Sequence, residues 1–278
     1  MDVGLFAMDV TLFYAALLLY LVGTIAYLLL LSVKGGPLDR MATAATLGGF
    51  VLHTLALLLP LYASGRPPLT NPHDALSFFG WVTVLVYLGL EFRFHRKTIG
   101  AFVLPIVLLA TAAAAILPKG AVALRPALES TWTWIHVTLV LLGTATFALT
   151  CGVGVMYLVQ EKQLKSKSLG AMYYRLPSLE FLDMLSHRSL LVGFPLLTVG
   201  LITGFIQAQS AWGRFLTWDP TQILALVTWV IYAGLLQARI TAGWRGRKAA
   251  ILSIIGFCAV LGAFLGASLV VGGPHAIN

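Results

Sequence analysis

Long apolar stretches separated by short polar segments run through the whole sequence. Each is about as long as the roughly 20 helical residues that cross a hydrocarbon core of about 30 Å. The stretches cover residues 8–33, 41–63, 76–92, 100–117, 131–160, 188–208, 220–238 and 248–272. The pattern predicts an all-α, polytopic transmembrane helix bundle of about eight spans, which we treat as a single integral membrane domain over residues 1–278.

Composition supports this interpretation. Hydrophobic residues make up 59% of the chain and charged residues only 10%, whereas a soluble domain carries about 25% charged residues. The first stretch is expected to be a true span and not a secretory signal. Residues 1–13 carry Asp2 and Asp9 and no basic residue, and no clear small-residue cleavage site follows.

Basic residues gather in alternate loops. Of the 18 Lys and Arg residues, all but Arg66, Lys119, Arg125 and Arg214 lie in or beside the first, third, fifth and seventh interspan segments. The positive-inside rule places those segments in the cytoplasm and both termini on the outer, periplasmic side of a bacterial cytoplasmic membrane. This topology accounts for the formal charge of +8, so no nucleic-acid partner is expected.

Histidines inside a helical bundle are informative, because a charge there costs several kcal/mol unless it is paired or liganded. His53 lies near the middle of the second span. It either hydrogen-bonds a neighbouring helix or ligates or gates something in the bundle. His136 lies a few residues into the fifth span, and His275 lies just past the last one. The predicted topology brings these two to the outer side.

A tryptophan-bearing loop, SAWGRFLTWDPTQ at residues 210–222, joins two spans on the same side. Two neutral imidazoles make a six-coordinate haem site, and flat indoles supply a platform for the macrocycle. Arg214 is suited to pair with a haem propionate. The alternative interpretation is an interfacial aromatic belt, which membrane proteins have routinely.

Three further features lead to local predictions. NPHD, ending at Asp74, is expected to form a turn and a helix start. Glu91 is expected to form an interfacial ion pair with Arg93. Leucines at every third position in LPSLEFLDMLSHRSLL, residues 176–191, predict a short amphipathic helix along the membrane surface, with Glu180 and Asp183 on its solvated face.

Seven segments along the chain carry a resemblance to a known family: HTLALLLPLYASGRPPLTN, EFRFHRKTIGAFVLP, WIHVTLVLLG, LPSLEFLDMLSHRSLLVGFPLLTVGLITG, AWGRFLTWDP, TWVIYAGLLQAR and GWRGRKAAILSIIGF. In order and spacing, they resemble the integral membrane cytochrome c assembly proteins of the CcsA/ResC type, and the related HemX proteins. The resemblance covers nearly the whole chain.

The resemblance implies a site for haem b, bound non-covalently and transiently. The family loop is similar to WGxxWxWDPKE and presents haem at the outer face between two histidines, which correspond to His136 and His275. His53 matches a family histidine associated with haem entry from the cytoplasmic side, whereas Gln237 replaces a second membrane histidine. The loop residues that keep the family pattern are Trp212, Trp218, Asp219 and Pro220, and those that depart from it are Leu216, Thr221 and Gln222.

The implied function is to offer reduced haem to the CxxCH cysteines of an apocytochrome c, with a ResB/CcsB-type membrane partner. The chain would then be at most one component of a cytochrome c haem lyase. Two alternatives stay open. One is a HemX-type accessory protein that acts on haem biosynthesis through glutamyl-tRNA reductase. The other is a structural subunit of a larger respiratory or photosynthetic membrane complex.

Overall fold

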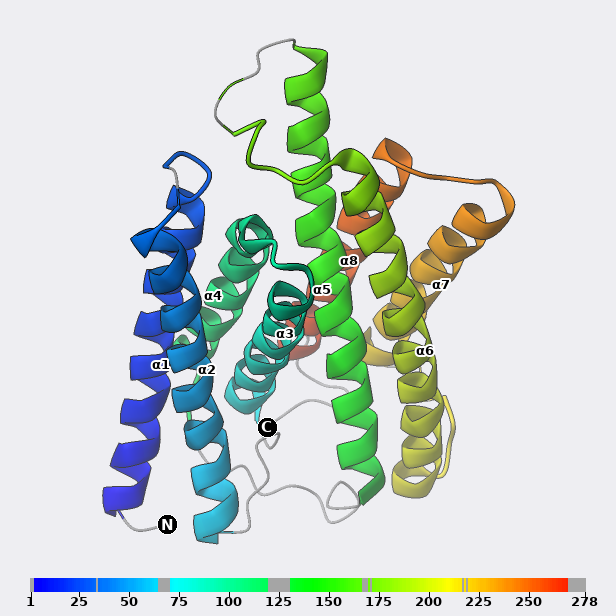
Figure 1. Ribbon diagram of the computed structural model, residues 1–278. Helices are drawn as coiled ribbons and strands as arrows, with labels where there is room; N and C mark the ends of the chain where they lie inside the picture. Colours follow the sequence, from blue (N-terminus) through cyan, green and yellow to red (C-terminus); the bar gives the residue numbers. More distant parts are fainter. Residues whose placement is uncertain are drawn as a thin grey trace. The chain divides into compact units, whose positions relative to one another are not determined.

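The computed structural model describes residues 3–33, 35–64, 71–119, 131–166, 170, 172–216, 218 and 220–269. Within these ranges the chain forms eight α-helices and one 3-10 turn, and no strand. The elements, labelled in Figure 1, are α1 (Val3–Leu29), α2 (Pro37–Ser64), α3 (Pro72–Phe94), η1 (Lys97–Ile99), α4 (Gly100–Ile116), α5 (Thr131–Lys165), α6 (Leu179–Trp212), α7 (Pro220–Thr241) and α8 (Arg247–Leu269).

The helices coincide with the eight predicted spans, so the all-α membrane fold is confirmed. Among the described residues, α1 to α7 contain stretches long and apolar enough to cross a membrane. Large apolar side chains such as Leu18, Val51 and Leu109 point outward from the helices. Lipid is the solvent that accepts such a surface, and helices satisfy their own backbone hydrogen bonds within it. The protein is therefore a multi-pass membrane protein.

The chain divides into two compact units, residues 1–120 with 158–179, and residues 121–157 with 180–278. In the first unit α1 packs along α2, and α4 packs against α1 and α3. Phe50 of α2 stacks on Trp81 of α3 with ring centroids 5.4 Å apart, and the Trp81 indole N–H donates to Thr54. Arg175 donates to the backbone carbonyl of Leu30, just past the end of α1, at 2.8 Å.

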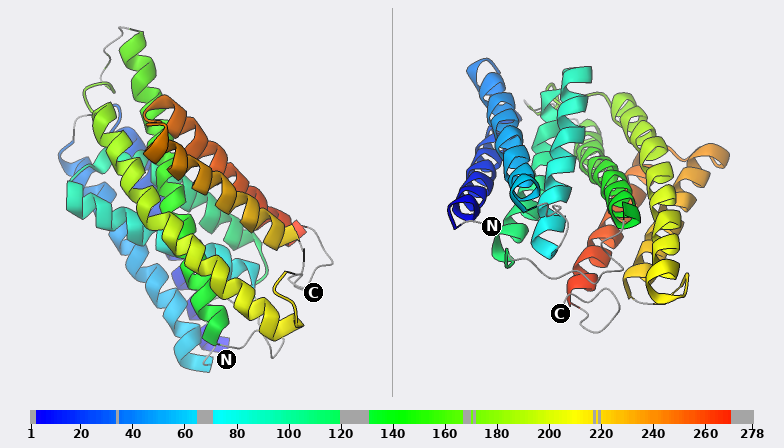
Figure 2. Two further views of the ribbon diagram at one scale, coloured as in Figure 1. Left: turned by 90° about the vertical axis from the view of Figure 1, so that its right-hand side faces the viewer. Right: turned by 90° about the horizontal axis from the view of Figure 1, so that it is seen from below.

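In the second unit specific contacts join α5 to α7 and α8, and α7 to α6. Phe147 of α5 stacks on Tyr232 of α7 with centroids 3.6 Å apart. A Cβ placed on Gly154 would lie 3.0 Å from the Ala250 carbonyl of α8, so these two helices approach closely. The Trp229 indole of α7 donates to Thr198 of α6. Figure 2 shows α7 and α8 lying side by side, in agreement with their contacts.

The expected amphipathic surface helix is wrong as a separate element. Residues from Leu179 onward form the first turns of α6, which continues without a break to Trp212. Leu182 and Leu185 are fully buried, and Asp183 forms an ion pair with Arg239 of α7 at 3.2 Å. The leucines therefore face protein, and Asp183 meets a buried cation of α7 that the local leucine pattern does not reveal.

Candidate functional site

His136, on the second turn of α5, is held against α6. Its Nδ1 lies 2.6 Å from the backbone carbonyl oxygen of Gly200. Since a carbonyl only accepts hydrogen bonds, Nδ1 must carry the proton, and the neutral ring then has its lone pair on Nε2. A neutral imidazole binds iron through such a lone pair, and a hydrogen bond from the other nitrogen to a backbone carbonyl is the usual arrangement for a metal-ligating histidine.

The tryptophan loop begins where α6 ends. Trp212 closes the helix and is half-buried, and Gly213 follows with φ +71°. Arg214, Phe215 and Leu216 are exposed. Along α6, Trp212 lies about 12 Å beyond the level of Gly204, at about 1.5 Å per residue. The loop therefore leaves α6 from the same end at which His136 contacts it.

Trp218 has an unusual backbone conformation. Its φ is +55°, in the left-handed region, and its side chain is 69% exposed. A bulky aromatic residue rarely adopts a positive φ, because its Cβ approaches the backbone. Because the indole is exposed, packing does not account for this conformation, which is more typical of a residue at a functional site. Asp219 and His275 lie outside the described residues, so the proposed iron ligand pair is described at His136 alone.

His53 lies in the other unit, fully buried among α1, α2 and α3. Its Nδ1 is 3.2 Å from the Tyr20 hydroxyl and its Nε2 is 2.8 Å from the Ser77 hydroxyl, so both ring nitrogens have hydrogen-bonding partners. The Phe13 ring meets the imidazole edge-on, with centroids 5.7 Å apart. These contacts match the interpretation that His53 bonds neighbouring helices. To bind iron, one nitrogen would have to leave its hydroxyl partner.

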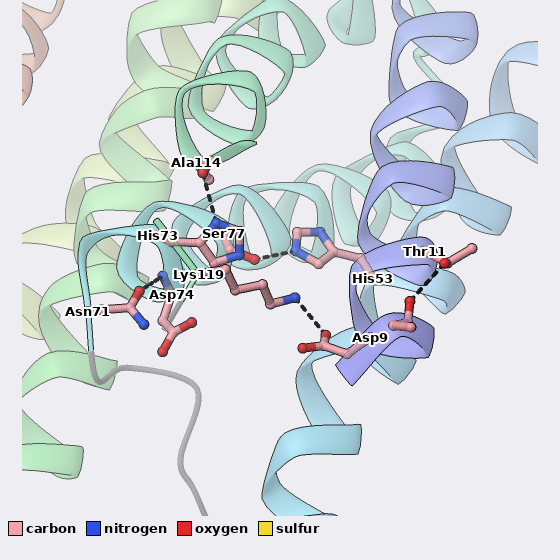
Figure 3. Close-up of polar contacts among 10 residues, drawn as sticks. Asp9, Thr11, His53, Asn71, His73, Asp74, Ser77, Ala114 and Lys119 are labelled. Atoms are coloured by element: carbon pink, nitrogen blue, oxygen red, sulfur yellow. Dashed lines mark hydrogen bonds and ion pairs between the residues drawn. The ribbon is translucent and has the colours of Figure 1, made fainter. Parts of the chain in front are cut away.

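Beside His53 lies a second buried histidine, shown in Figure 3. The predicted helix start is confirmed, because Asn71 caps α3 by accepting from the Asp74 N–H and Pro72 opens the helix. His73 is buried, and its Nδ1 donates to the Ala114 carbonyl of α4 at 2.8 Å. Its ring is tilted against Phe13 at a centroid distance of 4.8 Å.

An ion pair lies close to the Phe13 ring. Lys119, just past α4, contacts Asp9 of α1 at 2.7 Å, and its ammonium lies 5.4 Å from the Phe13 ring centroid. Asp9 is 1% exposed. No local sequence pattern pairs these two residues. The available signal was that Lys119 is one of the few cations outside the basic loops, and that Asp9 lies at the start of an apolar run.

Glu91 contradicts its sequence-based prediction. Its carboxylate is buried and does not pair with Arg93, whose guanidinium instead lies over the Phe94 ring. Three hydroxyls donate to it, from Tyr27 at 2.5 Å, Tyr87 at 2.6 Å and Thr43 at 2.5 Å. Glu91 therefore links α1, α2 and α3. Its partners from α1 and α2 are far away in sequence, so a local ion-pair rule could not find them.

These features define a class of protein: a helical multi-pass membrane protein with an orienting contact on a histidine, toward the same end of α6 as an aromatic loop. Comparison with known proteins gives the family. Residues 69–275 match the sequence model of the family described as Cytochrome C assembly protein. The chain therefore belongs to the cytochrome c assembly protein family and is a membrane protein of cytochrome c biogenesis.

Relatives named Cytochrome c biogenesis protein CcsA match over most of their length. The protein from Pyropia yezoensis is 33% identical, with 92% of each chain covered. That from Prochlorococcus marinus strain AS9601 is 37% identical, covering 81% of this chain and 80% of the relative. That from Mesostigma viride is 34% identical, with 87% of each chain covered.

A solved structure named Cytochrome c Heme Lyase CcmF shares the fold. The TM-score is 0.67 at 17% sequence identity, over 93% of this chain and 46% of that chain. The present chain thus spans about half the length of that protein. At this identity the similarity concerns the arrangement of helices only.

Proposed function

We propose that this chain holds haem at the outer membrane face and presents it for attachment to apocytochrome c. The observation that carries the proposal is the contact of His136 Nδ1 with the Gly200 carbonyl, 2.6 Å long, in a member of the cytochrome c assembly family. This contact leaves the lone pair on Nε2 and orients the ring as a metal ligand. Haem is the cargo, bound as haem b without a covalent link to this protein.

The residues of the loop fit such a cargo. The indoles of Trp212 and Trp218 are suited to lie against the macrocycle, and the exposed guanidinium of Arg214 is suited to pair with a propionate. His275 is the proposed second iron ligand, and Asp219 completes the loop motif. We propose that the attacking nucleophile is a thiol of the apocytochrome and that this chain contributes positioning.

The same proposal includes the membrane in which the chain lies, its topology and its partner. We place the chain in a bacterial cytoplasmic membrane, as one integral domain over residues 1–278, with both termini outside. A ResB/CcsB-type membrane protein would be its partner in a haem lyase. We assign His53 a place on the route by which haem enters, at the cost of one of its contacts with Tyr20 and Ser77.

Complementation tests the function. A host whose own gene for the corresponding cytochrome c assembly protein is deleted should regain c-type cytochromes when it receives the wild-type chain together with its membrane partner. The cytochromes are seen as haem-stained bands. His136→Ala should abolish this recovery, whereas the exposed Tyr62→Ala should retain it. Full cytochrome c production by His136→Ala at equal membrane levels would refute the proposal.

Departures in the site support a second function, that of a HemX-type accessory protein. Leu216 takes the place of a loop tryptophan, and Gln237 is exposed on α7 where the family pattern has a histidine. An amide oxygen is a much weaker iron ligand than imidazole. Unchanged c-type cytochromes with altered levels of glutamyl-tRNA reductase, after deletion of the gene in its own host, would favour this function over haem presentation.

A further inference from the structure

Two glycines on α6 lie under the contact with α5. Gly200 and Gly204 occur in GLITG, and this small-xxx-small spacing lets membrane helices approach closely. A Cβ on Gly200 would lie 2.8 Å from Cγ2 of Val140 and 3.2 Å from its backbone nitrogen. A Cβ on Gly204 would lie 2.5 Å from Cε1 and 2.7 Å from Nδ1 of His136.

Val140 and His136 are four residues apart on α5 and so share one face of that helix. The two glycines therefore form a notch, which we call the glycine notch (Gly200 and Gly204). Its first position receives Val140 and its second receives the imidazole. A real Cβ essentially never lies within 3.0 Å of such atoms, so any side chain at position 204 must displace the ring of His136.

The notch also determines which ring nitrogen faces α6. The carbonyl of Gly200 accepts from His136 Nδ1 at 2.6 Å and from the Thr203 hydroxyl at 2.8 Å. With the ring seated over Gly204, this carbonyl is within reach of Nδ1. A displaced ring would lose the contact, and with it the constraint on tautomer and rotation.

We propose that Gly204 is a positioning residue for the iron-ligating histidine. By lacking a side chain it seats the His136 imidazole on α6, so that the Gly200 carbonyl holds the Nδ1 proton and Nε2 carries the lone pair. This inference rests on the haem-handling function proposed above. It goes further by assigning a role to a residue that has no side chain with which to bind iron. A hydrogen-bonded Nδ1 also makes Nε2 a more basic ligand.

Gly204→Ala tests the proposal in the full-length, detergent-purified protein titrated with haem b. We expect haem affinity to fall about 10- to 100-fold, the usual loss when the hydrogen bond to the other nitrogen of a ligating histidine is removed. The low-spin spectrum should shift towards high spin, and added imidazole should restore the low-spin bands. The midpoint potential should rise, because a less basic ligand stabilises ferric iron less.

Two matched glycines control for packing. Gly143→Ala crowds the same pair of helices, since its Cβ would lie 3.1 Å from the Gly193 carbonyl, but it is two turns from His136. It should lower the melting temperature and leave the spectrum unchanged. Gly234→Ala, on α7 with no neighbouring atom within 4 Å, should change neither. If Gly143→Ala shifted the spin state as Gly204→Ala does, the positioning role would be overturned.

A measurement without haem keeps the inference testable if Gly204→Ala does not fold. Nitrogen-15 chemical shifts of His136 in the haem-free wild-type protein, assigned by comparison with His136→Ala, should report a proton on Nδ1. A proton on Nε2 would contradict the inference. Failure of the two proposals is distinguishable. Haem binding that depends on His136 but not on Gly204 overturns this inference only, whereas binding that ignores His136 overturns the proposed function as well.

Discussion

At the scale of single residues, the buried polar groups of the first unit serve to join helices. Glu91 receives hydroxyls from α1, α2 and α3, and His53 bridges Tyr20 and Ser77 from two flanking helices. In an apolar surrounding, such groups are costly when unpaired and stabilising when every partner is present. Their effect should therefore appear in stability measurements.

Replacing Glu91 with alanine should destabilise the protein by about 3 kcal/mol, because three hydroxyls lose their acceptor at about 1 kcal/mol each. Thermal melting in detergent measures the effect. Glu180→Ala, which removes an exposed carboxylate, is the matched control and should have little effect. Equal melting temperatures for the two variants would show that the hydroxyl contacts to Glu91 are not stabilising.

The burial of such polar residues is easier to predict from the sequence than the identity of their hydrogen-bonding partners. The sequence predicts a buried His53, because this residue interrupts an apolar run. The ion pair predicted for Glu91 is wrong because Arg93 is only close in sequence, whereas Tyr27 is 64 residues away and meets Glu91 only in the folded helix bundle. Partners of this kind follow from helix packing, and a periodic apolar pattern does not encode which helices are neighbours.

At the scale of elements, the helices were predictable because each apolar run had to cross lipid. The residues at which the helices begin and end were less predictable. α6 begins nine residues before the apolar run that predicted it, because Asp183 in its first turns is neutralised by Arg239 of α7 and accepts the Gly246 N–H. The sequence predicts that Asp183 faces solvent, whereas in the structure its charge is paired with Arg239 of another helix.

Breaking this pair should be costly at the element scale. Asp183→Asn leaves the buried Arg239 guanidinium without its counter-charge, and we expect a loss of about 2 kcal/mol. This is below the roughly 3–5 kcal/mol of a fully buried pair, since Asp183 is 19% exposed. The double variant Asp183→Leu with Arg239→Met should recover part of the loss on thermal melting. No recovery would indicate that the charges are not coupled.

At the scale of the whole molecule, the eight helices of the described residues and the alternating basic loops lead to one topological prediction. Segments rich in Lys and Arg should lie in the cytoplasm, and the tryptophan loop should lie outside. This arrangement is required by the proposed function, because the loop has to meet an apocytochrome on the outer side.

Labelling of single cysteines tests the topology, in a Cys151→Ser, Cys258→Ser background. In intact spheroplasts a membrane-impermeant maleimide should react with Phe215→Cys, in the exposed tryptophan loop, and not with Arg245→Cys, in the turn between α7 and α8. Permeabilised cells should show labelling at both positions. The reverse pattern in intact spheroplasts would place the loop in the cytoplasm and remove the basis for haem presentation there.

The candidate site was predictable in part from sequence. Counting the spans places His136 and the tryptophan loop on the same side of the membrane. The contact of His136 with Gly200 is not predictable in this way. It depends on two glycines, 64 and 68 residues downstream of His136, that have no chemistry of their own. Their importance lies in absent side chains, and that becomes visible only when α5 is seen to pack on α6.

The visible spectrum of the purified protein, with and without His136→Ala, tests the central claim most directly. After incubation with reduced haem b and removal of the excess, the wild-type chain should show the narrow bands of a low-spin, bis-histidine haem. His136→Ala should lose those bands, and added imidazole should bring them back. A wild-type chain that stays colourless, or a His136→Ala variant with an unchanged spectrum, would contradict the account.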